Sequence, residues 1–167
     1  MTMPSFNSLS KQRICNPILP YITSIPGGIF VGKTITIRGI IFDKEPYQFC
    51  IDLCCGRSVQ GENLDNKALH FNPRFIKKKG FFGKAENVLV LNSMIDNEWG
   101  RETRFGNYFQ LNSPFTIQIL VLEHYFSISL NEKHLLNYVH RLPYIEIDAL
   151  FINGAAKIDV IELDISM

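Results

Sequence analysis

The segment His70-Phe71-Asn72-Pro73-Arg74 decides the fold, because polar side chains occupy every second position in it. Side chains of a β-strand point alternately to its two faces, so His70, Asn72 and Arg74 share one face and Phe71 takes the other. Pro73 cannot donate a ladder hydrogen bond and is expected at a sheet edge or an irregularity. A row of donors about 7 Å apart makes a poor core, so the segment predicts a strand that reads a small polyhydroxylated ligand.

Two later segments carry groups that would complete a sugar site. Asn92 follows a strand-like run from Val88 to Leu91, and the segment from Asn97 to Arg104 holds the only tryptophan, Trp99. An indole ring offers a flat apolar surface for the C–H face of a sugar at low entropic cost. Glu102 is expected to pair with Arg74 and so to fix the guanidinium before a ligand arrives.

At these residues the chain resembles the galectins, lectins that bind β-galactosides. The resemblance covers about Pro17 to Leu163 and is specific in its combined spacing. The matching pattern comprises His70-x-Asn72-Pro73-Arg74, Val90-x-Asn92, Trp99-Gly100-x-Glu102-x-Arg104, Phe126-Ser-Ile-Ser-Leu-Asn131, His134 and Tyr138-Val-His140-Arg141-Leu-Pro143.

The resemblance implies a role for each of seven carbohydrate-binding residues. His70, Asn72 and Arg74 would read the axial 4-hydroxyl of galactose. Asn92 and Glu102 would hold the 6-hydroxyl, and Trp99 would stack on the ring. Arg74 and Glu102 would also reach the 3-hydroxyl of the next sugar, with Arg104 beside the 2-substituent of that sugar. An epimer with an equatorial 4-hydroxyl would leave buried polar groups unpaired.

The body of the chain reads as β-strands throughout. Alternating runs such as Ile35 to Arg38, Phe115 to Val121 and Phe126 to Leu130 are separated by turn signals, a pattern typical of an antiparallel sandwich. Ile145 and Ile147 are also expected to share a strand face. The resemblance implies an all-β, two-sheet jelly-roll sandwich with the sugar site on its concave sheet. We expect a flexible tail over residues 1–15 and one carbohydrate-recognition domain over residues 16–167.

Composition excludes several other classes of protein. The formal net charge is +1, which favours neither nucleic acid nor anionic membrane. No apolar run is long enough for a spanning helix, so we expect no membrane insertion. The N-terminal residues lack the features of a secretory signal, and the four cysteines are interpreted as reduced thiols of a cytoplasmic chain. The resemblance implies export without a signal peptide.

No catalytic, cofactor or metal site is expected. Glycoside hydrolysis usually needs two flanking carboxylates, one of them a general acid, and Arg74 beside Glu102 would keep that carboxyl ionised. The alternative to a lectin is a galectin-like sandwich that binds protein partners, with weak or absent sugar binding. Each chain carries one site, so crosslinking of glycans would need a homodimer or a second lectin domain.

Two long loops depart from the pattern of the family. The loop from Cys54 to Lys67 carries Arg57 and Lys67, which would face an acidic group on the galactose 3-hydroxyl, or else would belong to a charged surface loop. The segment 76–87 contains three successive lysines and then Phe81-Phe82. Its lysines are interpreted as a solvated hairpin tip, with a secondary glycan subsite as the alternative, and the two phenylalanines would either pack on the core or stay exposed.

Overall fold

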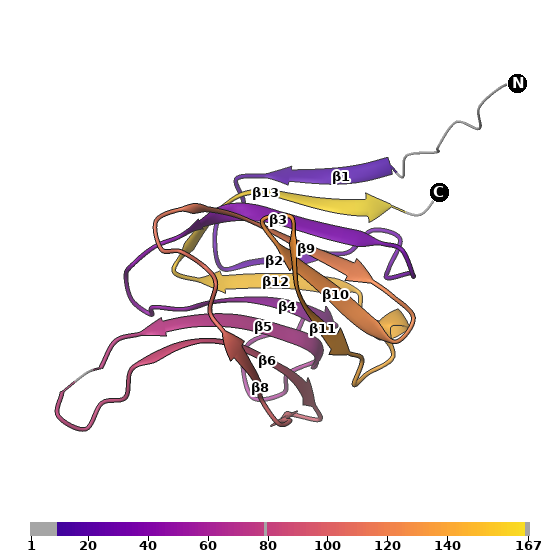
Figure 1. The fold of residues 1–167 in the computed structure, drawn as a ribbon. Coiled ribbons are helices and arrows are strands. Elements are labelled where there is room, and N and C mark those ends of the chain that lie inside the picture. The colour runs from indigo at the N-terminus through magenta and orange to yellow at the C-terminus, as the bar shows by residue number, and fades with distance from the viewer. Residues whose placement is uncertain (1–9, 79, 166–167) are drawn as a thin grey trace, which may run out of the picture.

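The computed structural model describes residues 10–78 and 80–165. These residues form a sandwich of two antiparallel sheets (Figure 1). The six-stranded sheet has the order β1 (Ser10–Cys15), β13 (Ala156–Ile165), β3 (Thr34–Ile41), β9 (Pro114–Val121), β10 (Tyr125–Leu130) and β11 (Lys133–Val139). The seven-stranded sheet has the order β2 (Tyr21–Ser24), β12 (Ala149–Gly154), β4 (Phe49–Cys55), β5 (Asn66–Ile76), β6 (Glu86–Ile95) and β7 (Glu98–Trp99), with β8 (Thr103–Gly106) also paired to β6.

The core lies between the two sheets and follows from the alternation of each strand. Ile117 and Ile119 of β9 and Phe126 and Ile128 of β10 are fully buried, while their neighbours in sequence are half-buried. On the opposite sheet, Phe71 of β5 points inward and is also fully buried. The predicted apolar faces therefore meet in one core, and the residues at alternate positions of β4, β5 and β6 are left on the outer face of the seven-stranded sheet.

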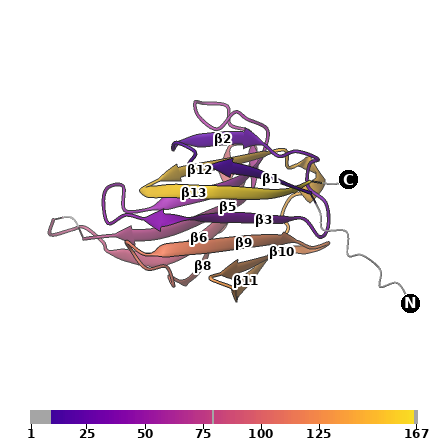
Figure 2. The ribbon, with the colours of Figure 1, turned by 90° about the horizontal axis from the view of Figure 1, so that it is seen from above.

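The chain crosses repeatedly between the two layers, as expected for a jelly-roll sandwich. The connections β1 to β2, β2 to β3, β3 to β4, β8 to β9, β11 to β12 and β12 to β13 each change sheet. Figure 2 shows the sandwich from above, turned by 90° from the view in Figure 1. Strands β5 and β6, which carry most of the predicted site, are adjacent through a long hairpin.

The expected N-terminal tail is wrong for residues 10–15. These residues form β1, which pairs with β13 from Ser10↔Ile165 to Cys15↔Val160, and Ile14 packs against the core. Ile14 is the one large apolar residue of Ser10–Cys15, so the segment has no alternation that could have indicated a strand. Residues 1–9, the rest of the predicted tail, lie outside the described residues.

The expected strand around Ile145 is also wrong. Tyr144–Glu146 form a single 3₁₀ turn, in which Ile145 is 74% exposed, whereas Ile147 is buried just before β12. Over residues 10–78 and 80–165, no helix is long and apolar enough to cross a bilayer. The four cysteines are all free, and of these Cys15 is exposed and Cys54 is buried.

Candidate functional site

A groove of about 450 Å³ lies on the outer face of the seven-stranded sheet, over β4, β5 and β6. Residues at every second position of β5 form its floor, because the other face of that strand is committed to the core. Trp99 lines the groove together with the polar side chains of Gln48, His70, Asn72, Arg74, Asn92, Glu102 and Asn153. A volume of this size is in the range of small-molecule sites.

Asn72 is fixed because the next residue is a proline. The backbone N–H of Phe75 donates to Tyr47 O at 2.7 Å, which sets the ladder between β5 and the chain before β4. Two residues earlier, the partner of Phe49 O would be the N–H of Pro73, which proline lacks. Asn72 Nδ2 donates to Phe49 O at 2.7 Å in its place. The predicted irregularity at Pro73 is therefore present, and it anchors a groove side chain.

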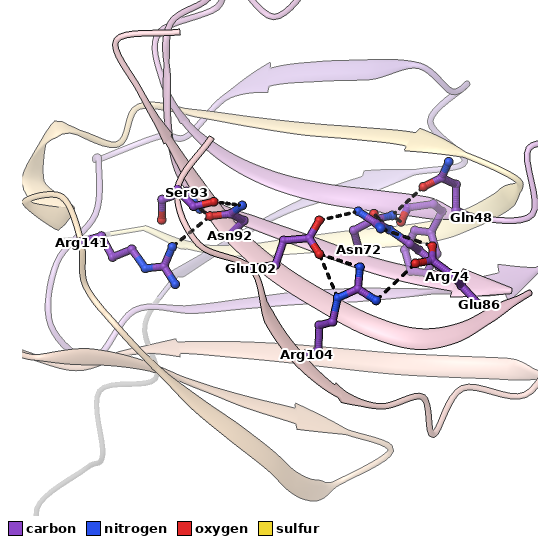
Figure 3. Close-up of polar contacts among 11 residues, drawn as sticks. Gln48, Asn72, Arg74, Glu86, Asn92, Ser93, Glu102, Arg104 and Arg141 are labelled. Atoms are coloured by element: carbon purple, nitrogen blue, oxygen red, sulfur yellow. Dashed lines mark hydrogen bonds and ion pairs between the residues drawn. The ribbon is translucent and has the colours of Figure 1, made fainter. Parts of the chain in front are cut away.

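Arg74 lies in a network of alternating charges (Figure 3). Its Nε donates to Asn72 Oδ1 at 2.8 Å, its Nη2 lies 3.3 Å from Glu102 Oε1, and its Nη1 lies 3.4 Å from Glu86 Oε2. Arg104 closes the network through Glu102 Oε2, 2.7 Å from its Nη2, and Glu86 Oε1, 3.2 Å from its Nη1. The expected pairing of Arg74 with Glu102 is confirmed, and both carboxylates contact both guanidinium groups.

The network determines the charge of Glu102. The hydrogen bond from Arg104 lowers the pKa of this carboxyl, partial burial opposes the change, and the charges of Arg74 and Arg104 lower it further. Glu102 is therefore an ionised hydrogen-bond acceptor and cannot serve as a proton donor near neutral pH.

Asn92 is held on three sides by its neighbours. Its Nδ2 donates to Gly100 O at 2.8 Å, and its Oδ1 accepts from Ser93 N at 2.8 Å and from Arg141 Nη1 at 2.9 Å. The amide nitrogen keeps one further hydrogen for a ligand. Arg141, which belongs to the family pattern but not to the seven predicted site residues, thus positions a groove residue, as Figure 3 shows.

A tight turn between β6 and β7 positions Trp99. Asp96 and Asn97 both have positive φ, 52° and 65°, as expected for a two-residue hairpin loop. Trp99 then pairs with Met94 and lies across the groove, 48% exposed. Asn97 also braces the loop from Cys54, because its Nδ2 donates to Glu62 O at 2.6 Å.

A bulge places Lys67 on the same face as His70, although the two residues are three positions apart and would face opposite sides of a regular strand. Lys67 pairs with Met94 and His70 with Asn92, so three steps of β5 oppose two of β6. Lys67 Nζ lies 2.6 Å from Asp52 Oδ2, and His70 Nδ1 lies 2.6 Å from Asp52 Oδ1. Asp52 is fully buried and Lys67 is 7% exposed. The His70 ring in turn lies 4.8 Å from the Trp99 ring.

Burial and pairing act oppositely on Lys67. Burial lowers the pKa of its ammonium group, but the charge and hydrogen bond of Asp52 outweigh burial and leave the pKa above its ordinary value. A charged Lys67 keeps Asp52 an acceptor, so His70 Nδ1 must be the donor of their hydrogen bond. The other ring nitrogen, Nε2, is then the acceptor in neutral His70.

The structure brings the predicted residues together with few exceptions. Six of the seven line the groove, and Arg104 stands behind Glu102. Sequence reasoning missed Asp52 and Glu86, and it gave Lys67 a different role from its pairing with Asp52. Alternation from Cys50 could have indicated Asp52, whereas a bulge in the middle of a strand gave no signal for Lys67.

The loop from Cys54 does not present the two predicted cations to the groove. Lys67 is buried against Asp52, and Arg57 Nη1 donates to Ser24 Oγ at 3.0 Å, beside a separate hollow that includes Ile22 and Phe151. Of the two alternatives that the sequence left for this loop, the contacts of Arg57 and Lys67 argue against the one in which both cations face an acidic group on the galactose 3-hydroxyl.

One group of possible metal ligands occurs in the described part of the chain. Donor atoms of Cys50, Asp52 and His70 lie within 4.8 Å of one another. Both oxygens of Asp52 are engaged with Lys67 and His70, and burial raises the pKa of the Cys50 thiol far above its usual range. A cation there would have to displace the Lys67 ammonium, so the donor set does not fit a resident metal.

The sequence matches known proteins over most of its length. Residues 20–163 match the family model described as galactoside-binding lectin. Relatives include galectin-3 of Oryctolagus cuniculus, 36% identical over 81% of this chain and 51% of that protein. Galectin-8 of Rattus norvegicus is 34% identical over 87% of this chain and 43% of its own length. The chain therefore spans about half the length of these curated relatives.

Solved structures show the same fold. The galectin LEC-6 of Caenorhabditis elegans superposes with a TM-score of 0.75 over 91% of this chain and 95% of that one, at 23% identity. A sheep galectin-11 complex with glycerol gives a TM-score of 0.69, at 22% identity over 86% of this chain and 96% of the other. With the match of residues 20–163, the chain belongs to the galactoside-binding lectin family, the galectins.

Proposed function

We propose that the groove binds β-galactosides such as lactose and N-acetyllactosamine-type glycans, without a metal or a cofactor. The observation that carries this proposal is the set of fixed polar side chains on one face of β5, with the half-exposed Trp99 across from them. Such a site is rigid before the ligand arrives, which lowers the entropic cost of binding.

The hydrogen-bonding character of the floor suits an axial 4-hydroxyl. His70 Nε2 would accept the hydroxyl hydrogen, because Asp52 holds Nδ1 as the donor. Arg74 would donate to the hydroxyl oxygen through an N–H that its partners Asn72, Glu86 and Glu102 leave over. One hydroxyl thus meets an acceptor and a donor together.

The other predicted roles also fit the surroundings of each group. Trp99 offers its exposed ring to the apolar face of galactose. Asn92 and the ionised Glu102 provide one donor and one acceptor for the 6-hydroxyl. Arg104 lies beside Glu102, at the place where a second sugar would continue.

The same charges argue against catalysis. Glu86 and Glu102 are each bound by two arginines, so neither can act as the general acid that glycoside hydrolysis needs. The groove carboxylates are already neutralised by cationic side chains, whereas a calcium site wants six or more oxygen ligands. We therefore expect lactose binding to survive EDTA, and a loss that calcium restores would contradict metal independence.

The test is retention on immobilised lactose. The chain should be retained and should elute with free lactose but not with sucrose. Trp99→Ala should abolish retention because it removes the stacking surface. Arg74→Ala should abolish it because truncation of one partner of a hydrogen-bonded charge pair costs about 2–5 kcal/mol of binding. The control is Phe82→Ala, which removes an exposed aromatic ring away from the groove and should be retained like the unmodified chain. A folded chain that ignores lactose would instead favour a protein-interaction module.

Crosslinking of glycans would need a second groove. One groove per domain would let a homodimer, or a second lectin domain in a longer protein, crosslink glycans. We also propose synthesis in the cytoplasm, which the free cysteines fit, and export without a signal peptide.

A further inference from the structure

The hairpin between β5 and β6 carries an apolar feature that neither the core nor the groove uses. Phe81 and Phe82 are 88% and 96% exposed, and their rings contact each other edge to face at 5.3 Å between centroids. Both belong to the turn that closes the hairpin, and Gly80, the first described residue of that turn, has a φ of +65°. The sequence left open whether these rings pack on the core; they do not.

The hairpin projects beyond the sandwich. Figures 1 and 2 both show the chain between β5 and β6 extending past the other loops, at the end away from the labels of the two termini. Exposed apolar patches mark sites of contact with proteins or membranes. Two adjacent rings at a projecting tip suit a lipid bilayer, because lipids can rearrange around the rings, whereas a protein partner would need a matching surface.

The charges around the rings are of one sign. No aspartate or glutamate occurs between Ile76 and Glu86. Lys78 Nζ lies 6.0 Å from the centroid of the Phe81 ring, and Lys84 is exposed on the other side of the turn. Lys77 is directed elsewhere, because it pairs with Asp43 at 2.9 Å. The tip therefore combines two apolar rings with lysines that complement a negatively charged surface.

We propose that this hairpin tip, formed by Phe81 and Phe82 with Lys78 and Lys84, docks on the surface of anionic lipid bilayers. The rings would lie at the boundary between headgroups and acyl chains, and the lysines would contact lipid phosphates and carboxylates. This contact is interfacial and involves no segment that spans the bilayer.

Docking by the tip also orients the galactoside groove. Arg74 and the tip belong to the same hairpin, and the groove lies on the face of the sheet whose strands lead to the tip. Contact through the tip would stand the sheet upright on the bilayer, with the groove open sideways to glycans on the same surface. The lipid contact itself does not depend on sugar binding.

The experiment is cosedimentation of the full chain with vesicles that contain no glycolipid, made of phosphatidylcholine with or without phosphatidylserine. Free lactose is present throughout, so that the groove cannot contribute. We expect binding to the vesicles with phosphatidylserine, weakening as salt rises. Phe81→Ser with Phe82→Ser should lower the partition coefficient at least about tenfold, since each ring loses its burial. Lys78→Gln and Lys84→Gln should each lower it about fivefold.

The matched control removes exposed apolar side chains elsewhere. Val139→Ser with Ile145→Ser deletes two residues that are 67% and 74% exposed at other sites, and should pellet like the unmodified chain. An unchanged lactose affinity shows that the phenylalanine variant is folded; should the chain bind no lactose at all, an unchanged urea unfolding curve serves instead. In Phe82→Trp, brominated lipids should quench the new tryptophan and spare Trp99.

Three results would overturn the proposal. The unmodified chain would not sediment with phosphatidylserine vesicles, the phenylalanine variant would sediment as well as the control, or Phe82→Trp would escape quenching. Sedimentation velocity tests whether the tip binds a second copy of the chain instead. A chain that does not bind vesicles, and that forms a dimer which the phenylalanine variant does not form, would assign the tip to a dimer interface. Failure of lactose retention with vesicle binding intact would contradict the proposed sugar site alone.

Discussion

At the scale of the residue, the groove depends on side chains that do not reach its surface. Asp52 has no exposed surface, yet both its oxygens are used, one by Lys67 and one by His70. Lys67 donates to one oxygen of Asp52 and His70 Nδ1 lies against the other, which leaves Nε2 as the His70 nitrogen that can face a ligand. Recognition of a hydroxyl by His70 therefore depends on Asp52, which is buried beneath the groove.

The buried pair gives a prediction about stability. Lys67→Met removes the cation and leaves a buried carboxylate without it, which should lower the free energy of unfolding by about 3–5 kcal/mol. Lys157→Met is the control, because its pair with Asp159 is 3.6 Å long and exposed; its cost should stay below about 0.5 kcal/mol. Urea unfolding measures both, and a loss below about 1 kcal/mol for Lys67→Met would show that the pair does not stabilise the fold.

Glu102 gives a prediction about pH. Because Arg104 and Arg74 lower its pKa below the ordinary value of 4.5, the ion pairs should stabilise the fold above that value and lose their contribution as pH falls through the lower, folded-state pKa. A ¹³C NMR titration of the carboxyl should find this low pKa, and Arg104→Ala should raise it.

The matched control for that titration is Arg101→Ala, which removes an exposed arginine adjacent in sequence and should leave the titration of Glu102 unchanged. An equal response to both variants would mean that general charge, and not the hydrogen bond from Arg104, sets the pKa.

The sequence predicted those groove residues whose positions follow from alternation and from the family pattern. It did not predict that Lys67 shares the face of His70, because the bulge between these residues changes the face that a step of three positions reaches. It missed Glu86, because the first residue of β6 meets Arg74 and Arg104 only once β5, β6 and β8 are in register. Irregular backbone and pairings across strands are long-range properties, and local periodicity carries no information on either.

At the scale of the element, strands with one buried face were predictable and polar or short ones were not. The runs around Ile117 and Ile128 alternate cleanly and form β9 and β10. Strand β1 has mostly exposed residues and exists because β13 offers it an edge. Ile145 shows the converse case, in which apolar spacing fails because a 3₁₀ turn, and not a strand, connects β11 to β12.

Strand β1 gives a prediction about truncation. A chain that begins at Asn16 should unfold at lower urea concentration than one that begins at Ser10, because β13 loses its partner and Ile14 loses its core contact. The expected loss is about 1–3 kcal/mol, the value of one buried isoleucine side chain. Equal unfolding midpoints would mean that residues 10–15 add nothing to the sandwich and belong to a tail.

At the scale of the whole molecule, the core occupies only one face of each sheet, and this leaves the other face of the seven-stranded sheet for a binding site. The two sheets need apolar faces to form the core, so β4, β5 and β6 have one face left for polar side chains, and their pairing brings these into a single groove. The hairpin of β5 and β6 extends from the same sheet, so a glycan site and a lipid-facing tip would share one rigid support (Figure 1).

The most direct test of the central claim compares two disaccharides that differ at one hydroxyl. Lactose and cellobiose differ only in the orientation of the 4-hydroxyl on the non-reducing sugar, which is the group that His70 and Arg74 are proposed to read. Titration calorimetry should detect lactose binding and a cellobiose affinity at least about a hundredfold weaker, since the wrong epimer leaves buried polar groups unpaired. Equal affinities for the two sugars, or no binding of either by the folded chain, would contradict the account.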